Sequence, residues 1–281
     1  MIEAILNYRF LQYAIIAALL SSIVCGLIGV IIVEKKLVMM SGGIAHTSYG
    51  GVGLGYLLGF EPILGAFIFS ILAALGIGFI KNKSTGFSDV VIGLFWSLGM
   101  SLGILFIGLM PGYPPNVTTY LFGNILSVTS FDLILMVILT VVVLLVITIF
   151  YQDWKAHLFD QEFTKILGKK TKLLENALLI LIALTVVVLI RVVGIVLVIA
   201  LLTAPAATAS LITKKLSLRM TYSIGFGLIF SLVGLWISYV VDIASGAVIV
   251  FFSILCYVSV YLIVRMIKKR KSILSLKEGL Q

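Results

Sequence analysis

The residue with the clearest capacity for chemistry is His46, which lies inside the glycine-rich segment 38–59. A neutral imidazole is well suited to bind zinc, manganese or iron, and an ionisable residue at membrane depth indicates a functional site. The structural alternative is a neutral histidine that is hydrogen-bonded between helices. Helical spacing places four glycines on the same face as His46, which predicts close helix packing or room for an ion pathway. These glycines are Gly42, Gly43, Gly50 and Gly53.

A second segment of small residues, 194–212, contains a proline inside its predicted helix. Pro205 interrupts the backbone hydrogen bonds and predicts a kink. Tight helix packing is the simpler interpretation of the small side chains around it. A kinked helix facing the His46 helix would also suit a gated central pathway. We therefore include Thr203, Pro205 and the tyrosine of the first segment, Tyr49, among the residues predicted to line a pathway.

Acidic residues occur mainly beside turns. Glu61 and Asp242 flank two turns that we expect on the external side, where a solvated acid or a helix cap is the simpler interpretation. They could also form an external rim that attracts cations. Asp132 begins a predicted span and is expected to be its N-cap. The second histidine, His157, lies in a polar loop and is expected to be solvated.

The composition points to a membrane. Hydrophobic residues make up 62% of the 281 residues, and the mean hydropathy is +1.25, whereas soluble domains are about 45–50% apolar. Apolar runs near 20 residues recur from end to end, which predicts an all-α, polytopic transmembrane bundle. No glycine loop of the Walker type is present, so this chain should not hydrolyse ATP, and we expect neither an enzyme nor a resident cofactor. Cys25 and Cys256 lie in apolar runs and are expected to be packing residues.

The loops suggest how the spans are oriented. The net charge of +9 lies mostly in short loops and the tail, where it indicates topology and contact with lipid rather than nucleic acid. We expect about eight or nine spans in one domain, 1–281, and the segment 38–59 is expected to be long and apolar enough to cross a bilayer. The nine segments are 11–33, 38–59, 63–80, 90–110, 132–150, 176–190, 194–212, 220–241 and 247–267.

The positive-inside rule gives a consistent orientation for these spans. Every lysine-rich loop falls on the cytoplasmic side when the basic tail 268–281 is placed there, whereas lysine-free loops such as 111–131 fall outside. Arg9 and Arg191 are the exceptions. We therefore expect a multi-pass protein of the cell membrane with a cytoplasmic C-terminus. Residues 118–126, after a proline-rich stretch, are a candidate for a short re-entrant or interfacial helix.

The longest polar segment, 151–175, carries apolar residues at helical spacing. A cytoplasmic amphipathic helix of this kind can lie on the membrane surface or dock into a partner. The sequence alone leaves these two alternatives open.

Four passages together give the chain a family resemblance. It resembles the integral-membrane permease subunits of ABC importers for zinc, manganese and related divalent metals, and the resemblance covers essentially the whole chain. The passages are SGGIAHTSYGGVGLGYLLG, FDQEFTKILG, VGIVLVIALLTAPAATASLI and VGLWISYVVDIASGAVIV.

The resemblance implies a homodimeric permease with a central pathway at its two-fold axis. Two cytoplasmic ABC ATPase subunits would supply the energy, and an extracellular or periplasmic metal-binding protein would deliver the ion. Residues 157–172 would contain a coupling helix that docks into the ATPase. The candidate coupling residues are Phe159, Asp160, Glu162, Phe163 and Gly168.

One departure from the family affects the expected cargo. The family commonly has an aspartate four residues before the histidine, and this position is Gly42 here. A hard ion such as manganese would miss that carboxylate more than zinc would, so the sequence favours zinc, with manganese or iron as alternatives. A permease for a metal chelate is a second hypothesis, although such chains are typically longer. A secondary transporter or a membrane enzyme is a third, but the spans contain almost no acids for ion coupling and the sequence shows no catalytic constellation.

Overall fold

The computed structural model describes residues 7–83, 88–112, 123, 125–159, 164 and 171–278, and the described part is helical with no strand. The apolar runs form long helices because every backbone group in lipid must be paired within the chain. The long helices are α2 (Arg9–Glu34), α3 (Val38–Leu58), α4 (Pro62–Lys83), α5 (Ser88–Gly108), α7 (Ser130–Ile149), α10 (Thr171–Val193), α11 (Ile195–Ile212), α12 (Leu216–Val241) and α13 (Ser245–Glu278).

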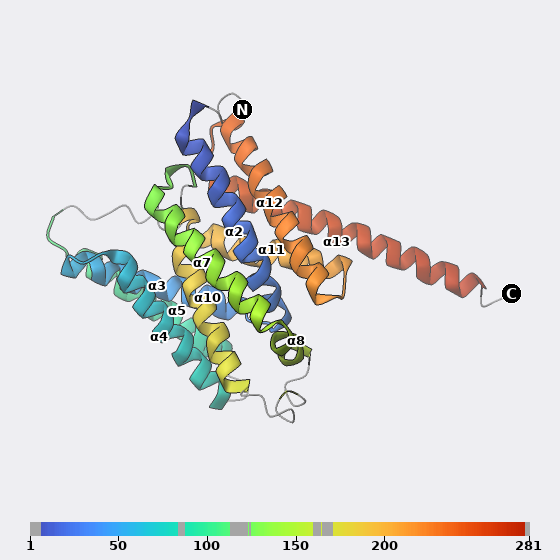
Figure 1. The fold of residues 1–281 in the computed structure, drawn as a ribbon, viewed down its shortest axis with the longest axis horizontal. Coiled ribbons are helices and arrows are strands. Elements are labelled where there is room, and N and C mark those ends of the chain that lie inside the picture. Colours follow the sequence, from blue (N-terminus) through green and yellow to red (C-terminus); the bar gives the residue numbers. More distant parts are fainter. Residues whose placement is uncertain are drawn as a thin grey trace.

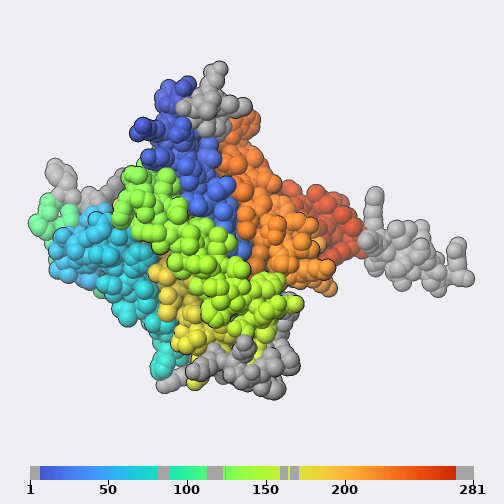
Figure 2. All heavy atoms as spheres, viewed as in Figure 1, coloured from blue at the N-terminus to red at the C-terminus, as the bar shows by residue number. Residues whose placement is uncertain are grey.

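Two groups of helices make up the bundle (Figure 1). In the first group, α3 packs against both α4 and α5, and in the second, α2, α11, α12 and α13 pack together. Helix α10 joins the groups because it contacts α3 and α4 on one side and α11 on the other. Figure 2 shows α2 flanked by α7 and α12 across one face of the molecule. Helix α13 extends away from the bundle, and most of its side chains between 251 and 269 are exposed.

Eight of the described helices are long and apolar enough to cross a membrane. The expectation that 38–59 is itself apolar enough was wrong, because α3 is the long helix that is not among the eight. Its glycines, hydroxyl side chains and His46 lower its hydropathy. Most of α3 is nevertheless buried by its neighbours, so its polar residues contact the surrounding helices rather than lipid.

Glycines allow α3 to approach its neighbours at backbone distance. A β-carbon at Gly51 would lie 2.0 Å from the carbonyl oxygen of Gly65 on α4. On the α5 side, a β-carbon at Gly99 would lie 2.3 Å from the Cα of Thr47. No real side chain fits at such separations, so these glycines are required for the close packing that the first group of helices shows.

The ends of several elements differ from the predicted spans. Helix α10 begins five residues before the predicted start at residue 176, and Gly194 alone separates it from α11, with a φ of 81°. Helix α13 continues through the start of the basic tail to Glu278. A short 3₁₀ turn, Ile125–Ser127, occupies the end of the candidate re-entrant segment, most of which lies outside the described residues.

Candidate functional site

His46 lies near the middle of α3 and remains partly exposed. Its ring stacks on Trp96 of α5, with the ring centroids 3.9 Å apart and the planes inclined by 12°. The Nδ1 atom is buried and has no hydrogen-bond partner among the described residues. The alternative of a histidine hydrogen-bonded between helices through Nδ1 is therefore not what the structure shows, and the ring is held by an aromatic contact.

Gly42, one helical turn before His46, faces the side chains of two other helices. A β-carbon built at Gly42 would lie 3.4 Å from Cζ3 of Trp96 and 3.8 Å from Cδ1 of Ile199 on α11. Side chains from α5 and α11 thus meet next to this glycine. The surface around His46 is built by three helices, which are far apart in the sequence.

The other predicted pathway glycines lie in helix contacts. Gly43 faces Ile92, and Gly50 and Gly53 face the backbone of Gly99 and Gly103 on α5. Tyr49, also predicted to line the pathway, is buried, with 1% of its surface exposed, and its ring lies beside Gly103. The structure therefore shows close packing at these positions, and their part in a pathway stays a prediction.

Helix α11 presents a partly exposed row of small side chains. Thr203 is partly exposed, and its hydroxyl donates a hydrogen bond of 2.7 Å to the carbonyl oxygen of Ile199 one turn earlier. Pro205 is buried inside the helix, which continues on both sides of it. Of these predicted pathway residues, Thr203 thus lies on the more accessible side of α11.

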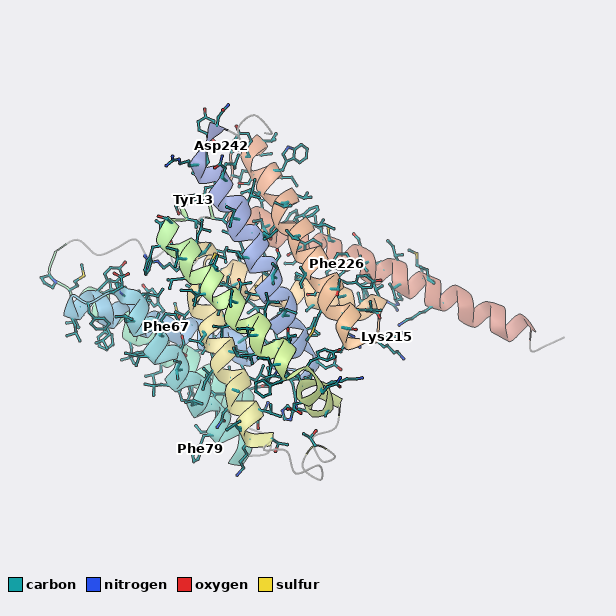
Figure 3. All side chains as sticks on the ribbon, in the orientation of Figure 1. Tyr13, Phe67, Phe79, Lys215, Phe226 and Asp242 are labelled. Carbon is teal, nitrogen blue, oxygen red and sulfur yellow. The ribbon has the colours of Figure 1, made fainter. Side chains whose placement is uncertain are left out.

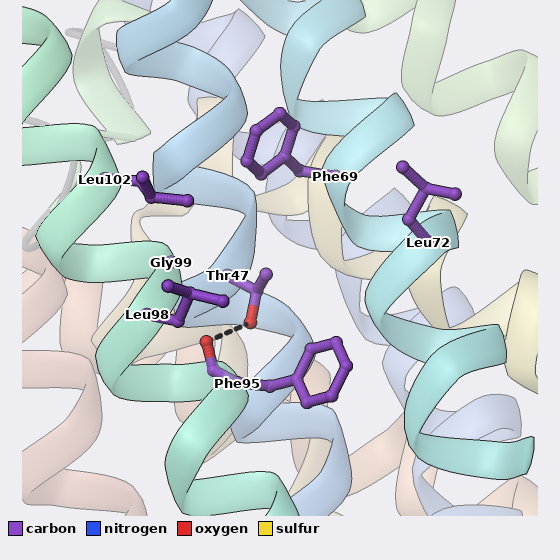
Figure 4. Close-up of a pocket in the computed structure, with 7 residues that line it drawn as sticks. All are labelled: Thr47, Phe69, Leu72, Phe95, Leu98, Gly99 and Leu102. Carbon is purple, nitrogen blue, oxygen red and sulfur yellow. Dashed lines mark hydrogen bonds between the residues drawn. The ribbon is translucent and has the colours of Figure 1, made fainter. Parts of the chain in front are cut away.

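A small apolar hollow of about 160 Å³ lies between α3, α4 and α5 (Figure 4). Two phenylalanine rings and three leucines line it beside Gly99 and Thr47. The Thr47 hydroxyl lies 2.7 Å from the carbonyl oxygen of Gly43 and 3.0 Å from that of Phe95. This hydrogen bonding joins α3 to α5 one residue after His46. The hollow offers no polar group that is free to bind a cation.

A charged cluster, which we call the Arg191 cluster, connects the starts of α4 and α7 with the end of α10. Nε of Arg191 lies 2.6 Å from Asp132, and its Nη1 lies 2.8 Å from Glu61. Asp132 is not the N-cap of α7, as expected, but its third residue. It forms a capping box with Thr129, which is the N-cap. Glu61 is half-exposed, and it pairs with Arg191 rather than being only a solvated turn acid.

Asp242, the other acid expected at an external turn, is not part of these ion pairs. It ends α12 in the left-handed region with a φ of 58° and is exposed. Figure 3 shows it near Tyr13, whereas Lys215 and Phe79 lie toward the opposite end of the molecule. A role for Glu61 and Asp242 in attracting cations stays a prediction.

A second polar region, which we call the Lys35 region, joins the end of α2 to α8 (Tyr151–Phe159) and α12. Nζ of Lys35 donates a hydrogen bond of 2.9 Å to the backbone carbonyl oxygen of His157. Glu34 pairs with Arg219, whose Nε also donates to the carbonyl oxygen of Thr213 at 2.8 Å. Burial lowers the pKa of the Lys35 ammonium, the nearby Glu175 opposes this shift, and Lys81 adds to it.

The expectation that His157 is solvated was wrong. It is 1% exposed, and neither ring nitrogen has a hydrogen-bond partner among the described residues. Burial, followed by the nearby Lys35 charge, lowers the pKa of His157 to about 4. The imidazole is therefore neutral at physiological pH. Trp154, one turn earlier in α8, is also buried.

The candidate coupling residues begin at the end of α8 and continue into the segment that follows it. Asp160, Glu162, Phe163 and Gly168 lie outside the described residues, and Phe159 is described only as the last backbone position of α8. Their proposed contact with an ATPase stays a prediction. The described part of this segment shows that α8 is packed on the bundle through Trp154 and His157.

Sequence reasoning did not identify Trp96, because nothing near it in the sequence indicates which helix it faces. The Arg191 cluster, by contrast, could have been inferred from the predicted topology. The predicted topology placed Glu61, Asp132 and Arg191 on one side, so two acids were available near the exceptional arginine. Within the described residues, no group of three or more histidine, cysteine, aspartate or glutamate side chains could hold a metal ion.

Comparisons with known proteins give the family. An uncharacterized membrane protein of Synechocystis is 42% identical over 260 residues, which are 92% of each chain. The manganese transport system membrane protein MntC of Listeria monocytogenes is 36% identical over 249 residues, which are 89% of each chain. The solved structure titled PsaBC from Streptococcus pneumoniae in complex with Fab matches with a TM-score of 0.82 and 32% identity. The match covers 92% of this chain and 94% of that one.

The family model named ABC 3 transport family matches residues 7–265. The expected resemblance is therefore confirmed, together with the all-helical, multi-pass membrane architecture. The preference for zinc is not supported, because manganese is the metal named for the Listeria relative. This chain belongs to the ABC 3 transport family of metal transporter permeases.

Proposed function

We propose that this chain is the permease of an ATP-driven importer for a divalent transition metal, with manganese as the favoured cargo and iron as the alternative. Family membership supports the transport role, and the name of the Listeria relative supports manganese. The observation that carries the site is the partly exposed His46 in the middle of α3, a helix enclosed by membrane-spanning helices. A neutral imidazole there can bind a divalent cation transiently.

A second copy of the chain would complete the pathway. Thr203 on α11 is partly exposed, and so is His46 on α3, which meets α11 at Gly42 and Ile199. Two such faces across a two-fold axis would enclose a pathway with one His46 from each copy. An ion passing through needs weak, shared ligation rather than a closed coordination shell, so that it can leave again.

The partner subunits would act from the two sides of the membrane. An ATPase dimer would bind on the cytoplasmic side, next to α8 and the segment that follows it, and alternating access would follow ATP binding and hydrolysis. A metal-binding protein would deliver the ion at the opposite side, near Glu61 and Asp242. The basic loops and tail support a cytoplasmic C-terminus through the positive-inside rule.

The test is the elemental content of metal-starved cells that express the complete transporter, with and without His46→Ala. We expect a rise in manganese with the unaltered chain and little rise with His46→Ala, while the assembled complex is purified in equal yield. Equal manganese accumulation by the variant would remove His46 from the mechanism. Accumulation of no metal at all would contradict the import of a free divalent ion and favour a metal chelate.

A further inference from the structure

We propose that Trp96 is a positioning residue for His46, because its indole fixes the plane of the imidazole and fills the space beside Gly42. This inference rests on the proposed function, since it concerns how His46 meets the transported ion. Trp96 would give the lone histidine of α3 a fixed orientation as a ligand, although no acidic side chain lies on this helix.

The first argument is the way in which the imidazole is oriented. A histidine that binds a metal usually donates its other ring N–H to a carboxylate or carbonyl group, which fixes the ring. The Nδ1 atom of His46 is buried and has no such partner in the described part of the chain. The near-parallel indole at 3.9 Å is the contact that remains to hold the ring plane. Stacking of the imidazole on Trp96 therefore takes the place of the usual hydrogen bond to the second ring nitrogen.

The second argument is the space beside Gly42. The β-carbon of an alanine would fit there, at 3.4 Å from the indole and 3.8 Å from Ile199. A longer side chain would compete for this space with Trp96 and Ile199, because both already lie at van der Waals distance from that position. A carboxylate one helical turn before His46 would therefore crowd the indole in its present place. We infer that Gly42 and Trp96 form a matched pair, in which the small residue leaves room for the large one.

The two arguments predict a specific kinetic effect. Without the indole, the imidazole can rotate about its side-chain bonds, and part of the free energy of ion binding is then lost in fixing its orientation again. Weaker ligation in the resting pathway should raise the KM for manganese without lowering the maximal rate, since Trp96 lies on α5, outside the segment that we propose to meet the ATPase. A phenyl ring can still stack on imidazole, whereas a leucine of similar bulk cannot.

The main experiment measures uptake of manganese by the complete transporter in proteoliposomes. We expect Trp96→Leu to raise KM about five-fold or more and Trp96→Phe to stay within about two-fold of the unaltered chain. Trp236, half-exposed on α12, supplies the matched control, and Trp236→Leu should leave KM unchanged. An unchanged KM in Trp96→Leu, or an equal rise in both Trp96 variants, overturns the role of stacking.

A second experiment tests the space beside Gly42. Gly42→Asp alone should abolish most uptake, because the new side chain meets the indole. Combining Gly42→Asp with Trp96→Ala should restore uptake to well above that of the single Gly42→Asp variant. Equal loss in the single and double variants would show that Trp96 and position 42 do not share this space, and the pairing would be wrong.

A third experiment needs no transport. The indole of Trp96 lies against the imidazole of His46, so His46→Ala should change the tryptophan emission of the purified transporter. The same substitution in a Trp96→Phe background should leave the emission unchanged. A change of equal size in both backgrounds overturns the stacking itself. Failure of the unaltered transporter to take up manganese would instead overturn the proposed function, so the two failures are distinguishable.

Discussion

The Arg191 cluster and the Lys35 region lie at opposite ends of the bundle and are stabilised differently. Helix α7 begins at the first and leads into α8 at the second. The Arg191 guanidinium meets two carboxylates, one almost fully buried and one half-exposed. Lys35 instead donates to a backbone carbonyl of α8, beside an imidazole with no partner among the described residues.

The comparison shows two ways of ending helices in a membrane protein. Opposite charges at the Arg191 cluster satisfy each other and also cap α7, so that three helix ends are joined by strong contacts. At the Lys35 region, a charge-assisted hydrogen bond from Lys35 reaches a backbone carbonyl of α8, and His157 is buried at a cost. We therefore expect the helix ends at the Arg191 cluster to stay folded under conditions in which α8 detaches from the bundle.

The largest expected effect is at Asp132. Asp132→Asn should lower the free energy of unfolding by about 2–3 kcal/mol, because it leaves the arginine short of a buried partner and weakens the capping box. The reaction of a maleimide with the buried thiol of Cys25 on heating, in a Cys256→Ser background, measures the unfolding.

Glu61→Gln supplies the matched control for this measurement. Its side chain is 53% exposed, and an exposed ion pair contributes less than about 1 kcal/mol. Equal shifts for the two variants would contradict the unequal roles assigned to the two acids.

The second effect is the response of α8 to acid. The folded pKa of His157 is about 4, whereas an ordinary histidine has a pKa of about 6.5. Between these values the unfolded chain binds more protons than the folded chain, so stability falls as the pH decreases from about 6.5 to 4. The contribution of His157 is fully present above pH 6.5, and we expect about 2 kcal/mol of it to be lost across this window.

Thermal unfolding followed by circular dichroism from pH 7 to 4.5 measures this loss. His157→Phe keeps a ring in the buried position and cannot titrate, so its unfolding temperature should fall less steeply with pH than that of the unaltered chain. Parallel pH profiles for the two proteins would show that His157 is accessible to protons in the folded state, contrary to its 1% exposure.

The fold was largely predictable from the sequence, because long apolar runs in lipid pair their backbone groups internally by forming helices. Even the two helices near Arg191 were predicted as separate spans, although Gly194 alone separates them and Arg191 itself lies in the last turn of α10. The boundaries of α10 and α13 were not, since polar first and last turns carry little hydropathy signal. The glycines of α3 predicted close packing, but which of them face α4 and which face α5 depends on contacts between distant segments.

The site was predictable only in part. His46 could be found because its residue type is rare in an apolar segment. Its partner Trp96 could not, since aromatic residues are ordinary in membrane helices and no local pattern identifies the facing helix. His157 was misjudged because a histidine in a polar stretch is usually solvated, whereas α8 folds back and buries it. Local sequence thus indicates which residues are unusual, and tertiary contacts decide what they touch.

The smallest expected effect is at Lys35 itself, and it isolates the attachment of α8. Lys35→Met keeps most of the apolar stem but removes the donor to the His157 carbonyl, which should cost about 1 kcal/mol locally. Hydrogen–deuterium exchange of the amides in α8 should then be about five-fold faster, with little change in α7. The neighbouring Lys36 is exposed, so Lys36→Met removes one charge from the same turn without removing this contact. Faster exchange in both variants would mean that the charge of the turn, rather than the hydrogen bond to α8, holds the helix in place.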